Sequence, residues 1–284
     1  MVYNPRTKKY TEENESRTLR FLYNNIIGRI ILKVLTMSWL TSLGGAYMNT
    51  KLSTRRIPKF IKENNINMDE YIGEEYSSFN DFFIRKIKDN KRELPKDDKL
   101  FISPADSKLT VYPITEDTVL SIKNSKYTIE EMVNDKELAN KYKGGYCLVY
   151  RLCVDDYHRY FFIDEGRIKK QYKIKGKFHT VQPIAFKKDK VFSENSRECT
   201  ILETNNYGTI TQIEVGALMV GKIVNHEAST FKRGDEKGYF LFGGSTVVLL
   251  VEKDKVIIDE DILKHSKDDI ETRVLLYDVI GKKK

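Results

Sequence analysis

The stretch GYFLFGGSTVVLLVEKDKV, Gly238–Val256, holds two apolar segments that each have the composition of a β-strand. Gly243 and Gly244 separate the two segments, and Ser245 opens the second one. Short runs rich in β-branched and aromatic residues and bounded by glycine are typical of buried strands. Because glycine has no Cβ, another group can approach the backbone closely at this break. The sequence therefore predicts a hydroxyl group at the start of a buried strand.

Similar strand-like segments dominate the chain beyond residue 90, separated by Gly, Asn-Asn or Lys-Asp turns. They are KLTVYPI, YCLVYRLCV, RYFFID, TVQPIAF, CTILET, TITQIEV, ALMVGKIV, YFLFGG and STVVLLVE. Before residue 90, apolar residues recur three and four apart, which indicates helices. We therefore expect an α+β fold, in which a helical N-terminal region, residues 1–90, packs on a β-rich barrel or sandwich, residues 91–284.

The composition is that of a globular protein with a basic surface. Hydrophobic residues make up 40% of the 284 residues, which is enough apolar mass for a sizeable core and excludes a disordered chain. Lys and Arg outnumber Asp and Glu by 49 to 41. This excess favours an anionic partner, either nucleic acid or acidic lipid headgroups. A nucleic-acid-binding β domain is the weaker interpretation, because the strands lack interleaved aromatic and basic residues.

The cysteines predict neither disulfides nor a metal centre. Cys147, Cys153 and Cys199 are an odd number, and no CxxC pair occurs. Cys147 and Cys153 lie in apolar segments of the sequence and are most simply core residues. We expect no metal site and a reducing compartment.

The most apolar early stretch, Leu22–Met48, is interrupted by two basic residues, and its uncharged part begins only at Val34. That part is shorter than the ~20 residues of a membrane-spanning helix. The polar residues before it do not resemble a signal peptide. We expect a helix that either packs on the domain or lies at a membrane surface, with Trp39 and Tyr47 at the headgroup boundary.

Three residues could form a catalytic group if the fold brings them together. A serine nucleophile such as Ser245 needs a base, and the base needs an orienting group. His158 lies in CVDDYHRYFFIDEG, a charged cluster between two strands, and Asp106 follows Ser-Pro-Ala where another strand starts. Either residue can also be purely structural, since a turn aspartate often binds its own backbone. Among the other histidines, His265 lies in a polar segment of the sequence, which predicts a surface position.

At these points the sequence resembles the phosphatidylserine decarboxylase family. Six motifs occur in the family's order between about residues 70 and 253. They are SSFNDFFIRKIKDNKRELP with its FNxFFxR core, SPADS for SPxDG, DYHR, FSENSRECTIL with its Asn-x-Arg element, EVGALMVGKI, and FGGST for the processing motif. A lone FGGST would be weak support, whereas six ordered motifs are strong support.

The resemblance implies an enzyme that makes its own cofactor. The chain would break itself between Gly244 and Ser245, giving a β chain, 1–244, and an α chain, 245–284, that stay associated. Ser245 would become a pyruvoyl group after His158, oriented by Asp106, takes its proton. The pyruvoyl group would form a Schiff base with phosphatidylserine, release CO2 and give phosphatidylethanolamine.

The resemblance also implies a position on the cytoplasmic side of the cell membrane, held peripherally, and it leaves homo-oligomer formation open. The region 1–90 would then associate with the membrane surface.

Two positions depart from the family's pattern. Phe161 stands where many members have a second histidine, three residues after the first, and Ser107 replaces the glycine of SPxDG. His179 is the candidate for supplying what Phe161 cannot. The alternative reading is a non-catalytic or impaired lipid-surface protein on the same scaffold.

Overall fold

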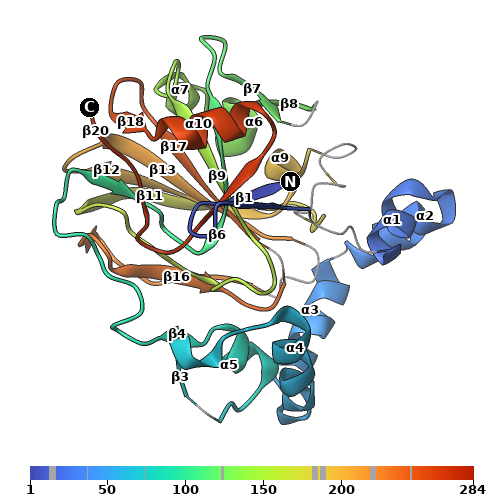
Figure 1. Cartoon of the computed structure of the whole chain (residues 1–284). Coiled ribbons are helices and arrows are strands. Elements are labelled where there is room, and N and C mark those ends of the chain that lie inside the picture. Colours follow the sequence, from blue (N-terminus) through green and yellow to red (C-terminus); the bar gives the residue numbers. More distant parts are fainter. Residues whose placement is uncertain are drawn as a thin grey trace.

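The computed structural model describes residues 1–12, 17–36, 38–73, 75–122, 125–180, 185, 190–217, 222–243 and 245–284. Gly244 and most of the predicted strand TVQPIAF lie outside these residues. The fold is α+β, as predicted, with a large sheet, several small sheets and a helical N-terminal part (Figure 1).

A ten-stranded sheet forms the centre of the molecule. Its order is β15-β11-β12-β13-β17-β9-β6-β19-β1-β2, and its described pairings are antiparallel except for the parallel pair of β1 and β19. The strands in this order are Thr230–Phe231, Gly166–Ile174, Arg197–Thr204, Gly208–Val215, Ser245–Val251, Tyr146–Leu152, Ser107–Pro113, Glu271–Val274, Val2–Asn4 and Lys9–Thr11.

Small sheets and short helices cover the large sheet. A three-stranded sheet has the order β10 (Arg159–Phe161), β16 (Glu236–Phe240), β14 (Ile223–Asn225), and another has β18 (Val256–Ile258), β20 (Val279–Lys283), β5 (Leu100–Ile102). Strand β16 lies below the large sheet in Figure 1, and the helices α6 (Ile129–Val133), α7 (Lys136–Asn140) and α10 (Glu260–Lys267) lie above it. Of the two predicted architectures, the fold is therefore the sandwich and not a closed barrel.

Strand β17 lies in the middle of the large sheet and is covered on both faces. Its two edges pair with β13 and β9, with Ser245 opposite Leu152 and Thr246 opposite Val215. The side chains from Val247 to Val251 are fully buried. A strand that is covered on both faces has apolar residues at successive positions, which explains why polar and apolar residues do not alternate in VVLLV.

The N-terminal part consists of short helices. They are α1 (Arg17–Asn24), α2 (Ile26–Leu35), α3 (Ser38–Met48), η1 (Lys51–Arg56), α4 (Ile57–Asn64), η2 (Met68–Glu70) and α5 (Phe79–Phe83). The small sheets β3 (Tyr71–Ile72) with β4 (Lys86–Ile87), and β7 (Val119–Ile122) with β8 (Ser125–Thr128), and the turn α9 (Val191–Glu194) complete the described elements.

Helices α1 and α2 form a tight hairpin that is anchored to the main body. A Cβ on Gly28 would lie 2.1 Å from the Phe21 carbonyl oxygen, so only glycine permits this approach. Asn25 caps α2 by accepting the backbone N–H of Ile27 at 2.9 Å. The buried Tyr23 hydroxyl accepts the backbone N–H of Thr180 at 3.1 Å, which fixes α1 to the β-rich part.

Several elements of the structure were not predicted, among them the short strands β18, β19 and β20 and the helices α6, α7 and α10 of the β-rich region. Residues 2–11, expected within the helical region, form β1 and β2, and β1 joins the large sheet beside β19. Strand β11, GRIKKQYKI, was not predicted, because its lysines hide the alternation of apolar residues. The partly buried Ile168, Tyr172 and Ile174 pack against the core, and the charged residues between them face solvent.

The Asn-x-Arg element is a structural clamp. The buried Arg197 donates hydrogen bonds to the backbone carbonyls of Glu131, Met132, Ser193 and Asn195 at 2.6–2.9 Å. Its guanidinium thereby joins the end of α6 to the turn α9. Burial lowers its pKa, but arginine remains charged at any physiological pH.

We predict that Arg197→Met destabilises the protein by about 3 kcal/mol, because four carbonyl oxygens lose their donor while remaining largely buried. Denaturant unfolding would measure the loss. Arg167→Met is the control, since Arg167 is exposed and pairs with Glu203 at the surface. Its loss should cost less than about 1 kcal/mol. Equal effects of the two substitutions would contradict the clamp.

Candidate active site

The serine and the histidine singled out by the sequence lie within hydrogen-bond distance. Ser245 Oγ is 3.1 Å from His158 Nδ1. Ser245 opens β17, and His158 ends the loop between β9 and β10. Both side chains are completely buried. The fold thus joins two residues that are 87 positions apart in the sequence.

The second ring nitrogen of His158 determines which nitrogen carries the proton. His158 Nε2 lies 2.8 Å from the backbone carbonyl oxygen of Cys153. A carbonyl oxygen can only accept a hydrogen bond, so Nε2 must carry the hydrogen. In the neutral ring Nδ1 then has a free lone pair and accepts the Ser245 hydroxyl hydrogen. This is the arrangement in which imidazole can take the proton of a serine nucleophile.

Burial keeps this imidazole neutral. Burial, opposed by the hydrogen bond to Cys153 and aided slightly by the charge of Arg85, brings the pKa of His158 down from 6.5 to about 3. The ring of Phe83 covers the imidazole, with a centroid distance of 4.1 Å. His158 is therefore an uncharged hydrogen-bond acceptor across the physiological pH range.

Asp106, the predicted orienting carboxylate, does not contact His158, whose two ring nitrogens have the partners given above. Arg92 donates to Asp106 Oδ2 at 2.9 Å, and the Leu276 backbone N–H donates to Oδ1 at 2.7 Å. Arg92 also pairs with Glu70 at 3.0 Å. Asp106 thus belongs to an ion-pair network that joins the helical part to the large sheet.

The motif FNDFFIR supports the site from the helical side. Asn80 Oδ1 accepts the backbone N–H of Phe242 at 2.9 Å and so holds the segment that leads to the Gly-Gly break. Phe83 covers His158, as described above. Arg85 is buried and lies over the Tyr71 ring at 4.3 Å. The sequence alone predicts no individual role for these residues, although the motif that contains them resembles the family's FNxFFxR core.

Phe161 lies away from the serine. Its ring is 6.4 Å from that of Tyr157 and 5.6 Å from that of Tyr277, in a small aromatic cluster with Tyr71 and Leu276. A histidine placed on the same backbone would point into this cluster and not toward Ser245. The substitution at this position therefore leaves the contact between Ser245 and His158 intact.

Two further histidines have partners outside the site. His179 Nδ1 lies 3.4 Å from the Tyr23 hydroxyl, and the His179 backbone is bound on both sides by the Asn195 side chain. His226 Nε2 lies 2.8 Å from a carboxylate oxygen of Glu236 near the surface. These contacts place His179 at the anchor of α1 and give it no contact with Ser245.

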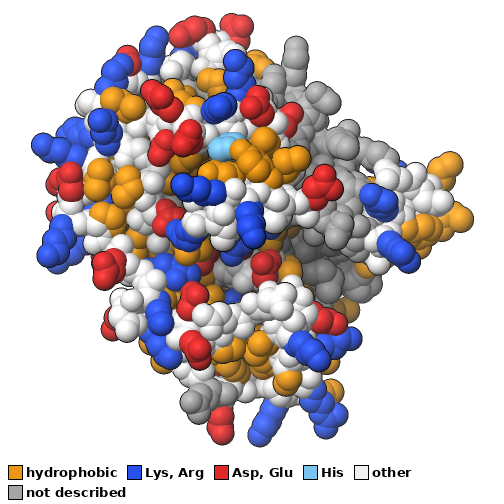
Figure 2. Space-filling model, in the orientation of Figure 1, with side chains coloured by type: hydrophobic (Ala, Val, Ile, Leu, Met, Phe, Trp, Pro, Cys, Tyr) orange, Lys and Arg blue, Asp and Glu red, His pale blue; other side chains and the backbone are white. Residues whose placement is uncertain are grey.

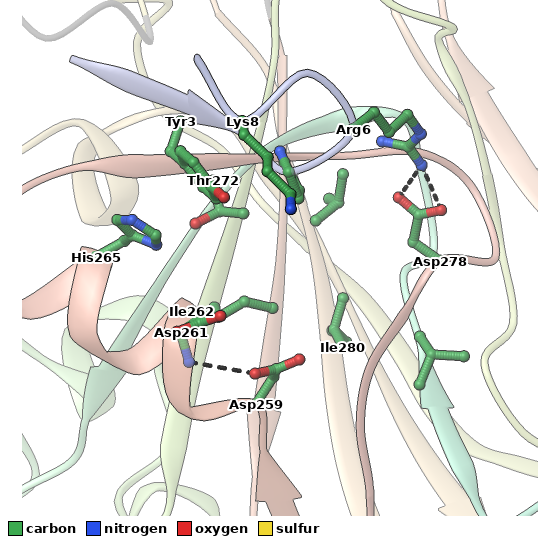
Figure 3. Close-up of a pocket in the computed structure, with 13 residues that line it drawn as sticks. Tyr3, Arg6, Lys8, Asp259, Asp261, Ile262, His265, Thr272, Asp278 and Ile280 are labelled. Atoms are coloured by element: carbon green, nitrogen blue, oxygen red, sulfur yellow. Dashed lines mark hydrogen bonds and ion pairs between the residues drawn. The ribbon is translucent and has the colours of Figure 1, made fainter. Parts of the chain in front are cut away.

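His265 was predicted at the surface, and this was wrong: it is 9% exposed and stacks on Tyr3 with ring centroids 4.3 Å apart. It borders a cavity of about 450 Å³, in which Tyr3 and Lys8 lie opposite Asp259 and Asp261 at the start of α10 (Figure 3). The N-terminal strands, misread as part of a helical region, are what bury His265. This cavity includes none of the predicted catalytic residues.

A polar cavity of about 250 Å³ lies beside the loop that carries His158. Its lining includes Arg92, Asp106, Asp155, Asp156 and Arg273. Asp106 therefore shares a cavity with the acidic residues that precede His158, although its own oxygens are bound elsewhere. This is the closest relation between Asp106 and the serine–histidine pair that the described contacts establish.

The same loop offers three atoms that resemble metal ligands. Side-chain atoms of Cys153, Asp155 and Asp156 lie within 4.8 Å of one another. Three cations already surround them: Lys108 Nζ and an Arg151 guanidinium nitrogen lie 2.8 and 3.0 Å from the Cys153 sulfur, and Arg273 lies 3.4 Å from Asp156. A dication would have to displace these cations, so the arrangement argues for contacts with basic side chains in place of a metal.

Fold and site together define an α+β sandwich with a buried serine–histidine pair at the start of a central strand. Comparison with known proteins gives the family. The sequence pattern of phosphatidylserine decarboxylase matches residues 79–274. The chain is 51% identical to phosphatidylserine decarboxylase proenzyme 2 of Clostridium acetobutylicum, covering 96% of this chain and 94% of that protein. Phosphatidylserine decarboxylase proenzymes of Clostridium tetani and Fusobacterium nucleatum are 44% and 42% identical, over 99% and 94% of this chain and 97% and 91% of those proteins.

The chain belongs to the phosphatidylserine decarboxylase family, which confirms the resemblance seen in the motifs. It is thus a decarboxylase, a carboxy-lyase, of phospholipid biosynthesis.

We predict that His158 makes the uncleaved protein more stable as the pH rises from about 3 to 6.5. The unfolded chain takes up a proton at this histidine below its ordinary pKa of 6.5, whereas the folded protein does so only near pH 3. The unfolded state holds more protons in this window, so raising the pH favours the folded state. Denaturant unfolding of the Ser245→Ala protein across the window would measure the slope.

The control is His158→Phe in the same background, which should lack this contribution. Asp156 acts in the opposite direction, because burial raises its pKa from 3.8 to about 7 and its contribution to stability falls as the pH rises through that range. Asp156 is present in both proteins and cancels in the comparison. A slope unchanged by His158→Phe would contradict a buried neutral imidazole.

Proposed function

We propose that this chain is a phosphatidylserine decarboxylase that breaks its own backbone between Gly244 and Ser245 to form a pyruvoyl group. The observation that supports this most directly is the 3.1 Å contact between Ser245 Oγ and Nδ1 of a buried, neutral His158. The names of the relatives, which are proenzymes of this activity, support it as well.

Self-cleavage begins when His158 Nδ1 takes the proton of Ser245 Oγ. The oxygen attacks the carbonyl carbon of Gly244, the carbon–nitrogen bond breaks as the nitrogen takes the proton back from His158, and an ester replaces the amide. The α-hydrogen of Ser245 is then removed as a proton, and the carboxylate of Gly244 leaves the serine β-carbon, which gives dehydroalanine. Water converts this residue to a pyruvoyl group and releases ammonia. Positioned general-base catalysis of this kind contributes roughly 10²–10⁴-fold to a rate.

The position of Ser245 fits a pyruvoyl group, whose carbonyl supplies an electron sink for decarboxylation of an amine substrate. Ser245 is the first residue of β17, so the break lies at the end of the strand and not within its ladder. β17 pairs with β13 and β9, and β19 pairs with β6 and β1. The strands of residues 245–284 therefore stay bonded to strands of residues 1–244.

This chain's own residues would shape the decarboxylation step. Phe83 gives the site an apolar wall, which excludes water and disfavours a charged carboxylate relative to neutral CO2. His158, beside Ser245, can return a proton to the carbon that loses CO2. Because Ser245 and His158 are fully buried before cleavage, the segment ending at Gly243 has to shift before a lipid headgroup can enter.

The α1–α2 hairpin supports a peripheral position on a phosphatidylserine-bearing membrane. Ile26, Ile27 and Ile30 of α2 are 81%, 63% and 61% exposed. Arg29 and Lys33 lie on the same helix, and hydrophobic side chains gather with basic ones where the hairpin projects from the molecule (Figure 2). An exposed apolar face with nearby cations is typical of helices that lie in an anionic membrane surface.

Within the described residues, no helix combines the length and apolar character needed to span a bilayer. The side chain of Trp39, expected at the headgroup boundary, lies outside the described ones. Tyr47 is 38% exposed near the end of α3. Membrane attachment in this proposal therefore rests on the exposed face of α2.

Ser245→Ala should leave one chain of 33.2 kDa and abolish CO2 release from phosphatidylserine. The unsubstituted protein should give two chains by intact mass spectrometry, the smaller one beginning with a residue that has lost its amine. His158→Ala should slow cleavage by at least ~100-fold, because Ser245 loses its proton acceptor.

The alternative, a non-catalytic protein on the same scaffold, predicts one intact chain for the unsubstituted protein under all conditions. Cleavage at the same bond in Ser245→Ala would overturn the assignment of the nucleophile. Phe161→His serves as a control, because this side chain lies away from Ser245. It should leave the cleavage rate unchanged.

The pair of substitutions Ile26→Glu and Ile30→Glu should weaken binding to vesicles that contain phosphatidylserine. Burying an isoleucine side chain contributes about 1.5 kcal/mol or more, so two losses should reduce affinity at least ~100-fold. Vesicle sedimentation would measure it. Ile257→Glu is the matched control, since Ile257 is 45% exposed on β18. An equal loss for the control would argue against a specific face.

A further inference from the structure

The loop before His158 contains a turn that one aspartate closes twice. The Asp156 backbone N–H donates to the Cys153 carbonyl oxygen at 2.9 Å. The Asp156 side chain in return accepts the Cys153 backbone N–H at 2.8 Å. Asp156 is 2% exposed, so these hydrogen bonds are protected from water. The backbone of Cys153 is held in one orientation as a result.

The Cys153 carbonyl is also the group that binds His158 Nε2, at 2.8 Å. A chain of contacts therefore runs from the Asp156 carboxylate through the Cys153 backbone to His158 and on to Ser245. We propose that Asp156 positions His158 against Ser245, acting through the backbone of Cys153. This inference rests on the proposed self-cleavage and adds a residue to it.

Asp106 has no comparable connection. Its two oxygens bind Arg92 and the Leu276 backbone. A carboxylate that orients a catalytic imidazole normally contacts the ring directly, but here a carbonyl oxygen occupies that place. Asp156 is the carboxylate that fixes this carbonyl. The positioning role expected of Asp106 therefore falls to Asp156.

The charges around Asp156 make its own charge sensitive to pH. Burial and the neighbouring Asp155 raise its pKa to about 7, whereas Arg273 on β19, Lys108 on β6 and the Cys153 N–H oppose this rise. Arg273 lies 3.4 Å from its second oxygen. When His158 takes the serine proton it becomes positive, and an ionised Asp156, linked to it through the Cys153 backbone, would stabilise that charge. Cleavage should therefore be faster once Asp156 has ionised.

Two substitutions separate position from charge. Asparagine keeps an oxygen that can accept the Cys153 N–H but carries no charge, whereas alanine provides neither. Asp156→Ala should slow cleavage by ~100-fold, the cost of a misplaced catalytic group. Asp156→Asn should restore most of the rate that the unsubstituted precursor has below pH 7. Precursor made by cell-free translation, sampled over time on a denaturing gel, would give these rates.

The pH profile provides a readout that a purely structural role would not change. The unsubstituted precursor, diluted into buffers on both sides of pH 7, should cleave faster on the alkaline side. Asp156→Asn should follow the slower, acid-side rate with no such rise. Asp155→Asn is the matched control from the same turn: it should still cleave, with the rise moved to lower pH, because the charge of Asp155 raises the pKa of Asp156.

The ring tautomer can be measured without any cleavage. In the Ser245→Ala protein labelled with ¹⁵N-histidine, NMR should show His158 with its hydrogen on Nε2. Adding Asp156→Ala should convert this signal to a mixture of tautomers, whereas adding Asp156→Asn should leave it unchanged. Should Asp156→Ala fail to fold, the pH profile of Asp156→Asn still tests the proposal.

The outcomes distinguish this inference from the function it rests on. If the unsubstituted chain never cleaves, the proposed function fails. If it cleaves and Asp156→Ala cleaves equally fast, or if Asp156→Asn is as slow as Asp156→Ala at every pH, positioning through Cys153 is wrong while self-cleavage stands. A Ser245→Ala protein whose His158 tautomer is the same with and without Asp156→Ala would also overturn the inference.

Discussion

The burial of a neutral imidazole against a serine hydroxyl is the constraint on which the rest of the structure depends. Polar groups removed from water are costly unless each finds a partner. Here the Ser245 hydroxyl donates to His158, and His158 donates to the Cys153 carbonyl. The covering ring of Phe83 keeps water out. The same burial that holds the histidine uncharged thus gives the hydroxyl a single acceptor.

The sandwich explains how a chain can be broken beside its core without coming apart. β17 lies between β13 and β9, with every side chain from Val247 to Val251 buried. The proposed break before Ser245 would remove one covalent bond at the end of this strand and leave its ladder hydrogen bonds intact. The sheet would then hold the new chain end where the serine was. A break in the middle of the strand would have no such support.

The helical part takes part in the site and is more than a covering layer. The Asn80 side chain accepts a hydrogen bond from the Phe242 backbone just before the Gly-Gly break. Arg92 forms ion pairs with both Glu70 of the helical part and Asp106 at the start of β6. The exposed face of α2 belongs to a hairpin whose Tyr23 is anchored at Thr180. The helical part thus contacts the β-rich part at two places, one beside the Gly-Gly break and one at the base of the hairpin.

The sequence by itself determined the α+β class, the buried strand that begins at Ser245 and the family. The reason is that the spacing of apolar residues and the order of the motifs depend only on which side chain stands at each position. It also pointed to His158 and Ser245 as a pair, although it could not show that they meet. Only the tertiary structure decided which group contacts the second ring nitrogen of His158. That group is the backbone carbonyl of Cys153, whereas Asp106 forms an ion pair with Arg92. The physical reason is that every residue carries the same backbone carbonyl, so no sequence pattern reveals which one will face a given ring.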